Sequence, residues 1–266
     1  MKYYTETDAK LHWLCQIVSK ANRTFISKKE DDSHTNLYFD SLGKYITGRW
    51  IGTQDARLLF MLNLENLNIE IKNDLGQLLS SVPTLGSTMQ KVEERIELLL
   101  PNLGLNPKGF RAELHYTIPD YSFTKETIQA IPEKSLEEWI RIRRMANEAC
   151  VLLLGHAQSE GEIRIWPHHF DTGIYTKINS KISLGFGLAM QDAMAGSPYF
   201  YMSGYPAQGK LEYNHLPSNG PWKWQTKTDW QGAYLPLTEF DSKTIKDQES
   251  LLHLFLSSVF NWYSAY

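Results

Sequence analysis

The chain has 266 residues, and its 27 Lys and Arg against 30 Asp and Glu give a formal net charge of −3. Apolar residues make up 42% and charged residues 21%, which excludes disorder over most of the length and predicts a folded globular protein. Because a duplex-binding protein usually carries a basic face, the near-neutral balance argues against nucleic acid as the main partner.

The N-terminal residues and the two cysteines indicate where in the cell the protein is expected. Residues 1–6 lack the apolar core of a signal peptide, and no run of about 18 apolar residues occurs, so neither a membrane span nor a membrane partner is expected. Cys15 and Cys150 fall on apolar faces of predicted helices, which indicates reduced core residues and no disulfide. A cytoplasmic location is expected, and the oligomeric state stays open.

The N-terminal half is predicted to open with a helix and to continue as strands. Thr7 or Asp8 can cap the helix, and apolar residues follow at helical spacing. Two β-rich runs, 36–39 and 44–47, flank a turn that contains glycine, which predicts a hairpin.

Further strands and a second helix are expected in this half. Residues 57–64 and 67–71 read as paired strands. A capping box that starts at Ser87 predicts a helix that Pro101 stops, and alternation over 112–118 predicts one more strand.

The C-terminal half repeats this order. A capping box at Ser135 opens a long helix that Gly155 is expected to end, a strand-rich stretch covers 162–237, and an apolar helical face follows over 252–263. Strands in series without helices between them imply antiparallel sheets, so the fold class is α+β.

Two similar halves, each a mainly antiparallel curved sheet packed with helices, are therefore expected at 1–125 and 126–266. The linker is best placed near 121–134, where Pro, Thr and Lys dilute the apolar pattern. One compact molecule is expected.

Several common site motifs do not occur in the sequence. It contains no Gly-x-Ser-x-Gly elbow, no Walker A loop, no Cys-x-x-Cys pair and no His-Glu-x-x-His helix. Gly185-Phe186-Gly187 begins like a dinucleotide fingerprint, but Met190 stands at the third glycine position and the run is strand-like. Close backbone packing or a bulge is the expected role of these glycines.

One aromatic-rich stretch contains the main functional candidates. Residues 161–235 hold 13 aromatic side chains in 75 positions, around Trp166-Pro167-His168-His169-Phe170-Asp171. In extended geometry His169 and Asp171 point to one side and His168 to the other. A carboxylate beside an imidazole fixes its tautomer and raises its basicity, so this pair can act as a general base.

The same pair has two other interpretations. It can belong to a divalent metal site, with further ligands from Asp192, His156, His12 or His215, although the spacing gives only weak support for a metal. It can also be a buried, hydrogen-bonded dyad that holds a strand corner together.

Two further sets are ambiguous between core and ligand contact. Trp222, Trp224 and Trp230 share parity along a strand-like stretch, which predicts one aromatic face that is more often core than a ligand wall. In Tyr199-Phe200-Tyr201, Phe200 is expected inward and the tyrosine hydroxyls on a partner or water.

His12 and Gln16 share one face of the first helix. A solvated face is the expected reading, and the alternative is that both reach the cavity of His169.

Four segments resemble a group of uncharacterised, mostly bacterial proteins known only as a domain of unknown function. They are Leu11-His12-x-x-x-Gln16, the Trp166–Asp171 hexapeptide, Gly185-Phe186-Gly187 and Pro198-Tyr199-Phe200-Tyr201. In that family a Gly-Asp pair follows the Gly-Phe segment and a Trp-His pair lies near the later tryptophans, where this chain has Gln191-Asp192 and Trp222-Lys223. The resemblance implies a common fold and site location, and no activity.

These observations predict a polar-aromatic pocket for a small polar ligand. The catalytic candidates are His169, Asp171 and His168. The ligand-binding candidates are Trp166, Tyr199, Tyr201, Asp192, His12 and Gln16. No residue is assigned to a metal. The first hypothesis is an enzyme that uses the His169–Asp171 dyad for acid–base chemistry. The alternative is a non-catalytic binding or scaffold protein in which the motif is structural.

Overall fold

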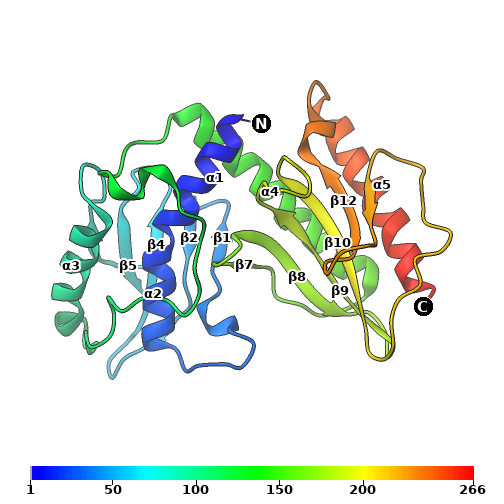
Figure 1. Ribbon diagram of the computed structural model, residues 1–266. Coiled ribbons are helices and arrows are strands. Elements are labelled where there is room, and N and C mark those ends of the chain that lie inside the picture. Colours follow the sequence, from blue (N-terminus) through cyan, green and yellow to red (C-terminus); the bar gives the residue numbers. More distant parts are fainter. Residues whose placement is uncertain (1) are drawn as a thin grey trace. The chain divides into compact units, whose positions relative to one another are not determined.

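A computed structural model describes residues 2–266 of the chain as two compact units. The N-unit comprises 6–140 and 165–170, and the C-unit comprises 2–5, 141–164 and 171–266. Helices accompany two antiparallel six-stranded sheets, which places the fold in the expected α+β class (Figure 1). No helix of the described residues is long and apolar enough to cross a membrane.

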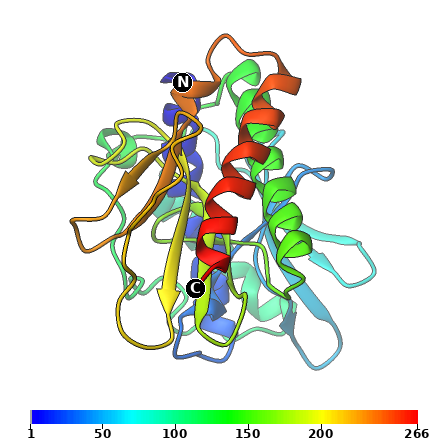
Figure 2. The ribbon, with the colours of Figure 1, turned by 90° about the vertical axis from the view of Figure 1, so that its right-hand side faces the viewer.

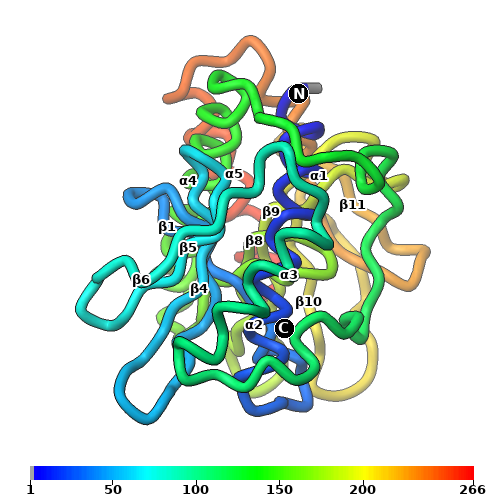
Figure 3. The backbone as a smooth tube through the Cα atoms, turned by 90° about the vertical axis from the view of Figure 1, so that its left-hand side faces the viewer, coloured from blue at the N-terminus to red at the C-terminus, as the bar shows by residue number. Residues whose placement is uncertain are grey.

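The first part of the chain builds the first sheet. Its elements are α1 (Lys2–Leu14), α2 (Gln16–Phe25), β1 (Tyr38–Asp40), β2 (Tyr45–Thr47), β3 (Ile51–Gly52), β4 (Arg57–Asn63), β5 (Ile69–Asn73), β6 (Leu78–Val82) and α3 (Met89–Leu99). The strands follow the order β1-β2-β4-β5-β6, and β3 pairs with β4. Figure 3 shows β4, β5 and β6 together, with the β5–β6 hairpin at the margin.

The strands of the N-unit agree with the sequence prediction where residues of the turn itself determine the pairing. The predicted first hairpin is confirmed, with Phe39 paired to Ile46, and Asp40 accepts the Gly43 amide in its turn. The buried residues of β4 and β5 form the core: Phe60, Leu62, Ile69 and Ile71.

The start of α1 and the strand predicted at 112–118 differ from expectation. Helix α1 already begins at Lys2, and Asp8 does not cap it but accepts the Trp139 indole N–H at 2.7 Å. Residues 112–118 form no strand. The Arg23 guanidinium donates to four main-chain carbonyls over 109–113 and holds this irregular stretch in place.

The second sheet and two long helices make up most of the remaining chain. The elements are α4 (Glu133–Ala157), β7 (Arg164–Trp166), β8 (Asp171–Lys177), β9 (Ile182–Ala189), β10 (Tyr199–Pro206), β11 (Lys223–Gln225), β12 (Gly232–Pro236) and α5 (Ile245–Ser264). The sheet order is β11-β12-β10-β9-β8-β7. Figure 2 shows α5 running beside α4.

One face of this sheet packs on the helices. Phe200 of β10 contacts Phe240, and the Tyr263 hydroxyl of α5 donates to the Met202 carbonyl at 3.4 Å. The Arg143 side chain of α4 donates to the Thr172 hydroxyl of β8 at 2.7 Å. Because side chains alternate along strands, Asp171, Tyr199 and Tyr201 belong to the opposite face.

Three details of the helices and strands correct or confirm the sequence reading. Helix α4 begins at Glu133, before the Ser135 box, and continues through Gly155, so the predicted stop is wrong. Helix α3 is capped by Thr88, whose hydroxyl accepts the Lys91 amide, and not by Ser87. The close packing expected at Gly187 is confirmed, because an added Cβ would collide with the Thr172 carbonyl.

Candidate functional site

The hexapeptide does not run as a strand. Trp166 ends β7, and the next four residues turn, with the Phe170 amide donating to the Trp166 carbonyl at 2.6 Å. Phe170 has a φ of 56°, a left-handed conformation that costs a non-glycine residue about 1–2 kcal/mol. The parity argument for His169 and Asp171 assumed an extended chain, so that premise is wrong.

Burial of its side chain offsets the strain at Phe170. Its ring is fully buried and stacks on the His12 imidazole, with centroids 5.1 Å apart and an interplanar angle of 14°. Burying a phenylalanine ring contributes about 2–3 kcal/mol, which exceeds the conformational cost. The turn is therefore held by packing against α1.

The Pro167 carbonyl receives two hydrogen bonds within the N-unit. His12 Nε2 and Gln16 Nε2 each lie 2.9 Å from this oxygen. A carbonyl only accepts, so Nε2 of His12 carries the proton and Nδ1 accepts from the Tyr121 hydroxyl at 2.7 Å. Both ring nitrogens of His12 are thus used in hydrogen bonds.

The expectation that His12 and Gln16 lie on a solvated face is wrong. Their exposed fractions are only 1% and 7%. The irregular stretch after α3 covers them, because Tyr121 bonds His12 and the Tyr116 hydroxyl donates to Gln16 Oε1 at 2.9 Å. A cover built by non-local tyrosines leaves no periodic signal in the sequence.

His168 and His169 lie beside each other in the N-unit, with ring centroids 4.2 Å apart. His168 is half-buried and contacts the Tyr116 ring, whereas His169 is exposed. Burial, followed by the neighbouring His169, lowers the pKa of His168 to about 4. His168 is therefore neutral near pH 7.

In the C-unit, Asp171 is bonded to a tyrosine from two strands away. The Tyr201 hydroxyl of β10 donates to Asp171 Oδ2 of β8 at 2.6 Å. Tyr201 stands beside Gly187 of β9, which stands beside Gly173 of β8. A Cβ on Gly173 would lie 3.2 Å from the Tyr201 hydroxyl, so glycine there lets the tyrosine reach across the sheet.

Strand β10 contributes a second tyrosine that is bonded to a carboxylate. The Tyr199 hydroxyl donates to Asp192 Oδ2 at 2.6 Å, while Asp192 Oδ1 accepts the amides of Met194 and Ala195. Burial is the main cause that raises the pKa of both Tyr199 and Tyr201, and the carboxylates add to it. Both phenols are neutral donors at any physiological pH.

We define the tyrosine face as the aromatic side chains on the sheet face that α4 and α5 do not cover. These are Tyr175, Tyr199, Tyr201, Tyr205, Trp230 and Tyr234. Tyr175 and Tyr205 are 49% and 45% exposed, and their centroids lie 5.4 Å apart. The expected division of Tyr199-Phe200-Tyr201 is confirmed, because Phe200 is fully buried and both hydroxyls are bonded.

The tryptophans do not share one face. Trp222 packs on Phe255 and Trp224 on Trp262, both in α5, which confirms the core reading for these two. Residues 226–231 interrupt the strand, and Trp230 lies instead over Gly232, 6.4 Å from the Tyr201 ring. No pattern in the sequence predicted that Trp230 and Tyr234 would lie on the tyrosine face.

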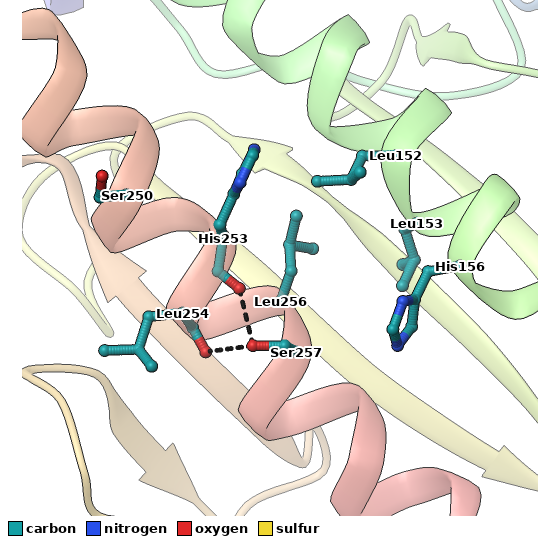
Figure 4. A pocket seen from close by; sticks show the side chains of 8 residues that line it. All are labelled: Leu152, Leu153, His156, Ser250, His253, Leu254, Leu256 and Ser257. Atoms are coloured by element: carbon teal, nitrogen blue, oxygen red, sulfur yellow. Dashed lines mark hydrogen bonds between the residues drawn. The ribbon is translucent and has the colours of Figure 1, made fainter.

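A cavity of about 520 Å³ lies between α4 and α5 of the C-unit (Figure 4). Half of its lining residues are leucines, of which Leu152 and Leu254 are partly exposed, and the lining includes His156 and His253. His156 was a candidate partner for the dyad, and its ring contacts Phe260 at 4.8 Å. None of the predicted catalytic or ligand-binding residues lines this cavity.

The structure thus groups the predicted site residues into two sets. His12, Gln16, Trp166, His168 and His169 belong to the N-unit, and Asp171, Asp192, Tyr199 and Tyr201 to the C-unit. The pairing of His169 with Asp171 stays a prediction. Within residues 2–266, no group of three or more His, Cys, Asp or Glu side chains is arranged to hold a metal ion.

Comparisons with known protein families, with curated protein sequences and with solved structures find no match to this chain.

Proposed function

We propose that this protein binds a small polar ligand on the tyrosine face, without catalysis, and that the Trp166–Asp171 segment serves the fold. The observation that carries the proposal is the hydrogen bond from Tyr201 to Asp171, which crosses the glycine positions 173 and 187. If the ring of Tyr201 served only to fill space, phenylalanine would be enough, and no hydroxyl bonded to a buried carboxylate would be needed.

The tyrosine face has the chemistry of a ligand platform. Tyr175 and Tyr205 are half-exposed, and large aromatic surfaces that remain in contact with water can stack on ring-shaped or apolar parts of ligands. Their hydroxyls supply polar contacts that orient a ligand. Such a surface binds by stacking and hydrogen bonding, and needs no proton transfer.

The contacts of the hexapeptide support its structural role. The Pro167 carbonyl is used by His12 and Gln16, Phe170 is fully buried, and Asp171 accepts from Tyr201. Buried polar groups that satisfy one another are what a structural motif requires.

A thermal-shift screen tests the proposal. Sugars, nucleosides, amino acids and organic cations are each added to the wild type, to Tyr205→Ser, to Tyr234→Ser and to the control Tyr3→Ser, which changes a 70% exposed tyrosine on α1. A ligand at about 100 times its Kd stabilises by about 2.7 kcal/mol. The proposal expects a shift in wild type and control that at least one of the two tyrosine-face variants lacks. Equal shifts in all four proteins would contradict it.

A second candidate is an enzyme in which His169 moves a proton on the ligand and Asp171 orients the imidazole. The exposure of His169, beside a His168 that burial keeps neutral, favours this candidate. Mass analysis of any screened ligand after incubation separates the two. Conversion by wild type and none by His169→Asn would support the enzyme.

We also propose that the two halves arose by duplication, that the chain belongs to the family that its motifs resemble, and that it works in the cytoplasm. The two sheets of six strands support the first, and the contact between His12 and Pro167, which joins two motif segments, supports the second. The burial of both cysteine side chains, Cys15 and Cys150, fits thiols in a reducing compartment.

A further inference from the structure

We propose that one end of the tyrosine face binds an alkylammonium cation, an inference that rests on the proposed function and names the ligand class. The binding residues are the four-ring cluster, defined as Tyr199, Tyr201, Trp230 and Tyr234. The ring faces of aromatic side chains carry negative electrostatic potential, and they attract cations whose charge is spread over methyl groups.

The rings of the four-ring cluster stand at steep angles to one another. Tyr199 meets Tyr201 at 64° and Tyr234 at 70°, and Tyr201 meets Trp230 at 82°. Centroid separations run from 5.8 to 6.5 Å. Rings in several orientations at one place are the walls that a rounded cation requires, whereas a flat ligand needs parallel rings.

Two carboxylates strengthen the preference for positive charge. Asp171 and Asp192 each accept a hydroxyl of the cluster at 2.6 Å. These bonds place negative charge beside the cluster and also fix the orientations of Tyr201 and Tyr199, so less side-chain freedom is lost on binding. The tyrosines stay neutral, because burial raises the pKa of each phenol.

A glycine next to the cluster leaves room for one of its rings. A Cβ on Gly232 would lie 3.0 Å from the Trp230 ring and 2.5 Å from the Met202 carbonyl. Glycine at this position lets the indole lie against β12 beside Tyr234. Strand β12 therefore supplies both the ring of Tyr234 and, at Gly232, the space that the Trp230 ring occupies.

The positive charge of Lys223 should repel a cation bound at the cluster. Lys223 of β11 pairs with Tyr234 and so shares its side of the sheet. The side chain is exposed, and water and salt screen its charge. Removing this charge should tighten binding of a cation and leave a neutral ligand unaffected.

The experiment compares choline with 3,3-dimethylbutan-1-ol, a neutral molecule of the same shape, by titration calorimetry and tryptophan fluorescence. Wild type and the control Tyr3→Leu should bind choline at least about tenfold more tightly than the alcohol, the range that cation–π contacts give. Tyr234→Leu should lose this difference. Circular dichroism checks that the variant is folded.

A second variant keeps the test decisive if Tyr234→Leu does not fold. Lys223→Met should bind choline about twofold or more tightly than wild type, with no gain for the alcohol. Equal affinities for choline and the alcohol would overturn the cation inference while leaving a ligand site on the tyrosine face. Absence of choline binding to wild type also overturns it, and the wider screen then decides the proposed function separately.

Discussion

His12 and Pro167, which stand 155 positions apart, are joined by a hydrogen bond of 2.9 Å from the imidazole to the carbonyl. The two residues belong to separate motif segments, and the bond gives the histidine of the first segment a structural role, because its imidazole bonds the main chain of the second. An imidazole with one donor and one acceptor nitrogen can bond Pro167 and Tyr121 at once. The link therefore serves the N-unit fold.

Replacing His12 with Leu should destabilise the protein by about 1–3 kcal/mol, because the Tyr121 hydroxyl loses its partner and the Pro167 carbonyl keeps only Gln16. Urea unfolding measures the loss. His253→Leu, on the exposed side of α5, is the matched control and should cost little. Equal losses in the two variants would remove the structural role assigned to His12.

Removing the Tyr201 hydroxyl tests the bond that crosses the second sheet. Tyr201→Phe should lose about 1.5–3 kcal/mol of unfolding free energy, since the hydroxyl donates to the buried Asp171 carboxylate. Tyr205→Phe removes the hydroxyl of a half-exposed tyrosine and should change stability by less than about 0.5 kcal/mol. A loss no larger than that of the control would mean that the bond contributes nothing.

An added methyl group at Gly187 should force β8 and β9 apart. Gly187→Ala would place its Cβ against the Thr172 carbonyl and 2.9 Å from the Gly173 Cα, which backbone atoms cannot easily relieve. We expect a loss of about 2 kcal/mol or more. Gly52→Ala, whose Cβ meets nothing within 4 Å, is the control, and thermal melts that match for both would contradict the close approach.

Acid should destabilise the N-unit through His168. Its pKa falls from 6.5 to about 4 because the folded protein buries the imidazole, next to His169. The fold thus favours the neutral form, so this stability is complete above pH 6.5 and is lost as the pH falls through 6.5 toward 4. Screening limits the effect to about 1–2 kcal/mol.

His168→Gln removes this titration. Unfolding free energies of the variant should decline less than those of wild type over the same pH range, whereas His253→Gln should follow wild type. Parallel curves for His168→Gln and wild type would assign the acid sensitivity to other groups.

Local signals in the sequence predicted much of the fold. The hairpin around Asp40, the strand predicted at 57–64 and the apolar face of α5 all follow from turn chemistry or periodicity within one element. The strand expected at 112–118 failed because its alternation was not matched by a partner strand. Arg23, almost ninety positions earlier, holds that stretch as an irregular cover.

The candidate site was less predictable, because it depends on register and on bonds between distant residues. The sequence identified Asp171, Tyr199 and Tyr201, but it could not place Tyr201 beside Gly187 and Tyr234 in neighbouring strands. It also took residues 166–171 as extended, whereas the positive φ of Phe170 makes them a turn. Packing on His12 decides that conformation, and no local pattern encodes it.

The most direct test of a ligand site on the tyrosine face is the choline Kd of two variants, Tyr234→Leu and His169→Asn, measured side by side. The account predicts that Tyr234→Leu binds at least about tenfold more weakly than wild type while His169→Asn binds as wild type does. Loss of binding in His169→Asn with full binding in Tyr234→Leu would contradict it.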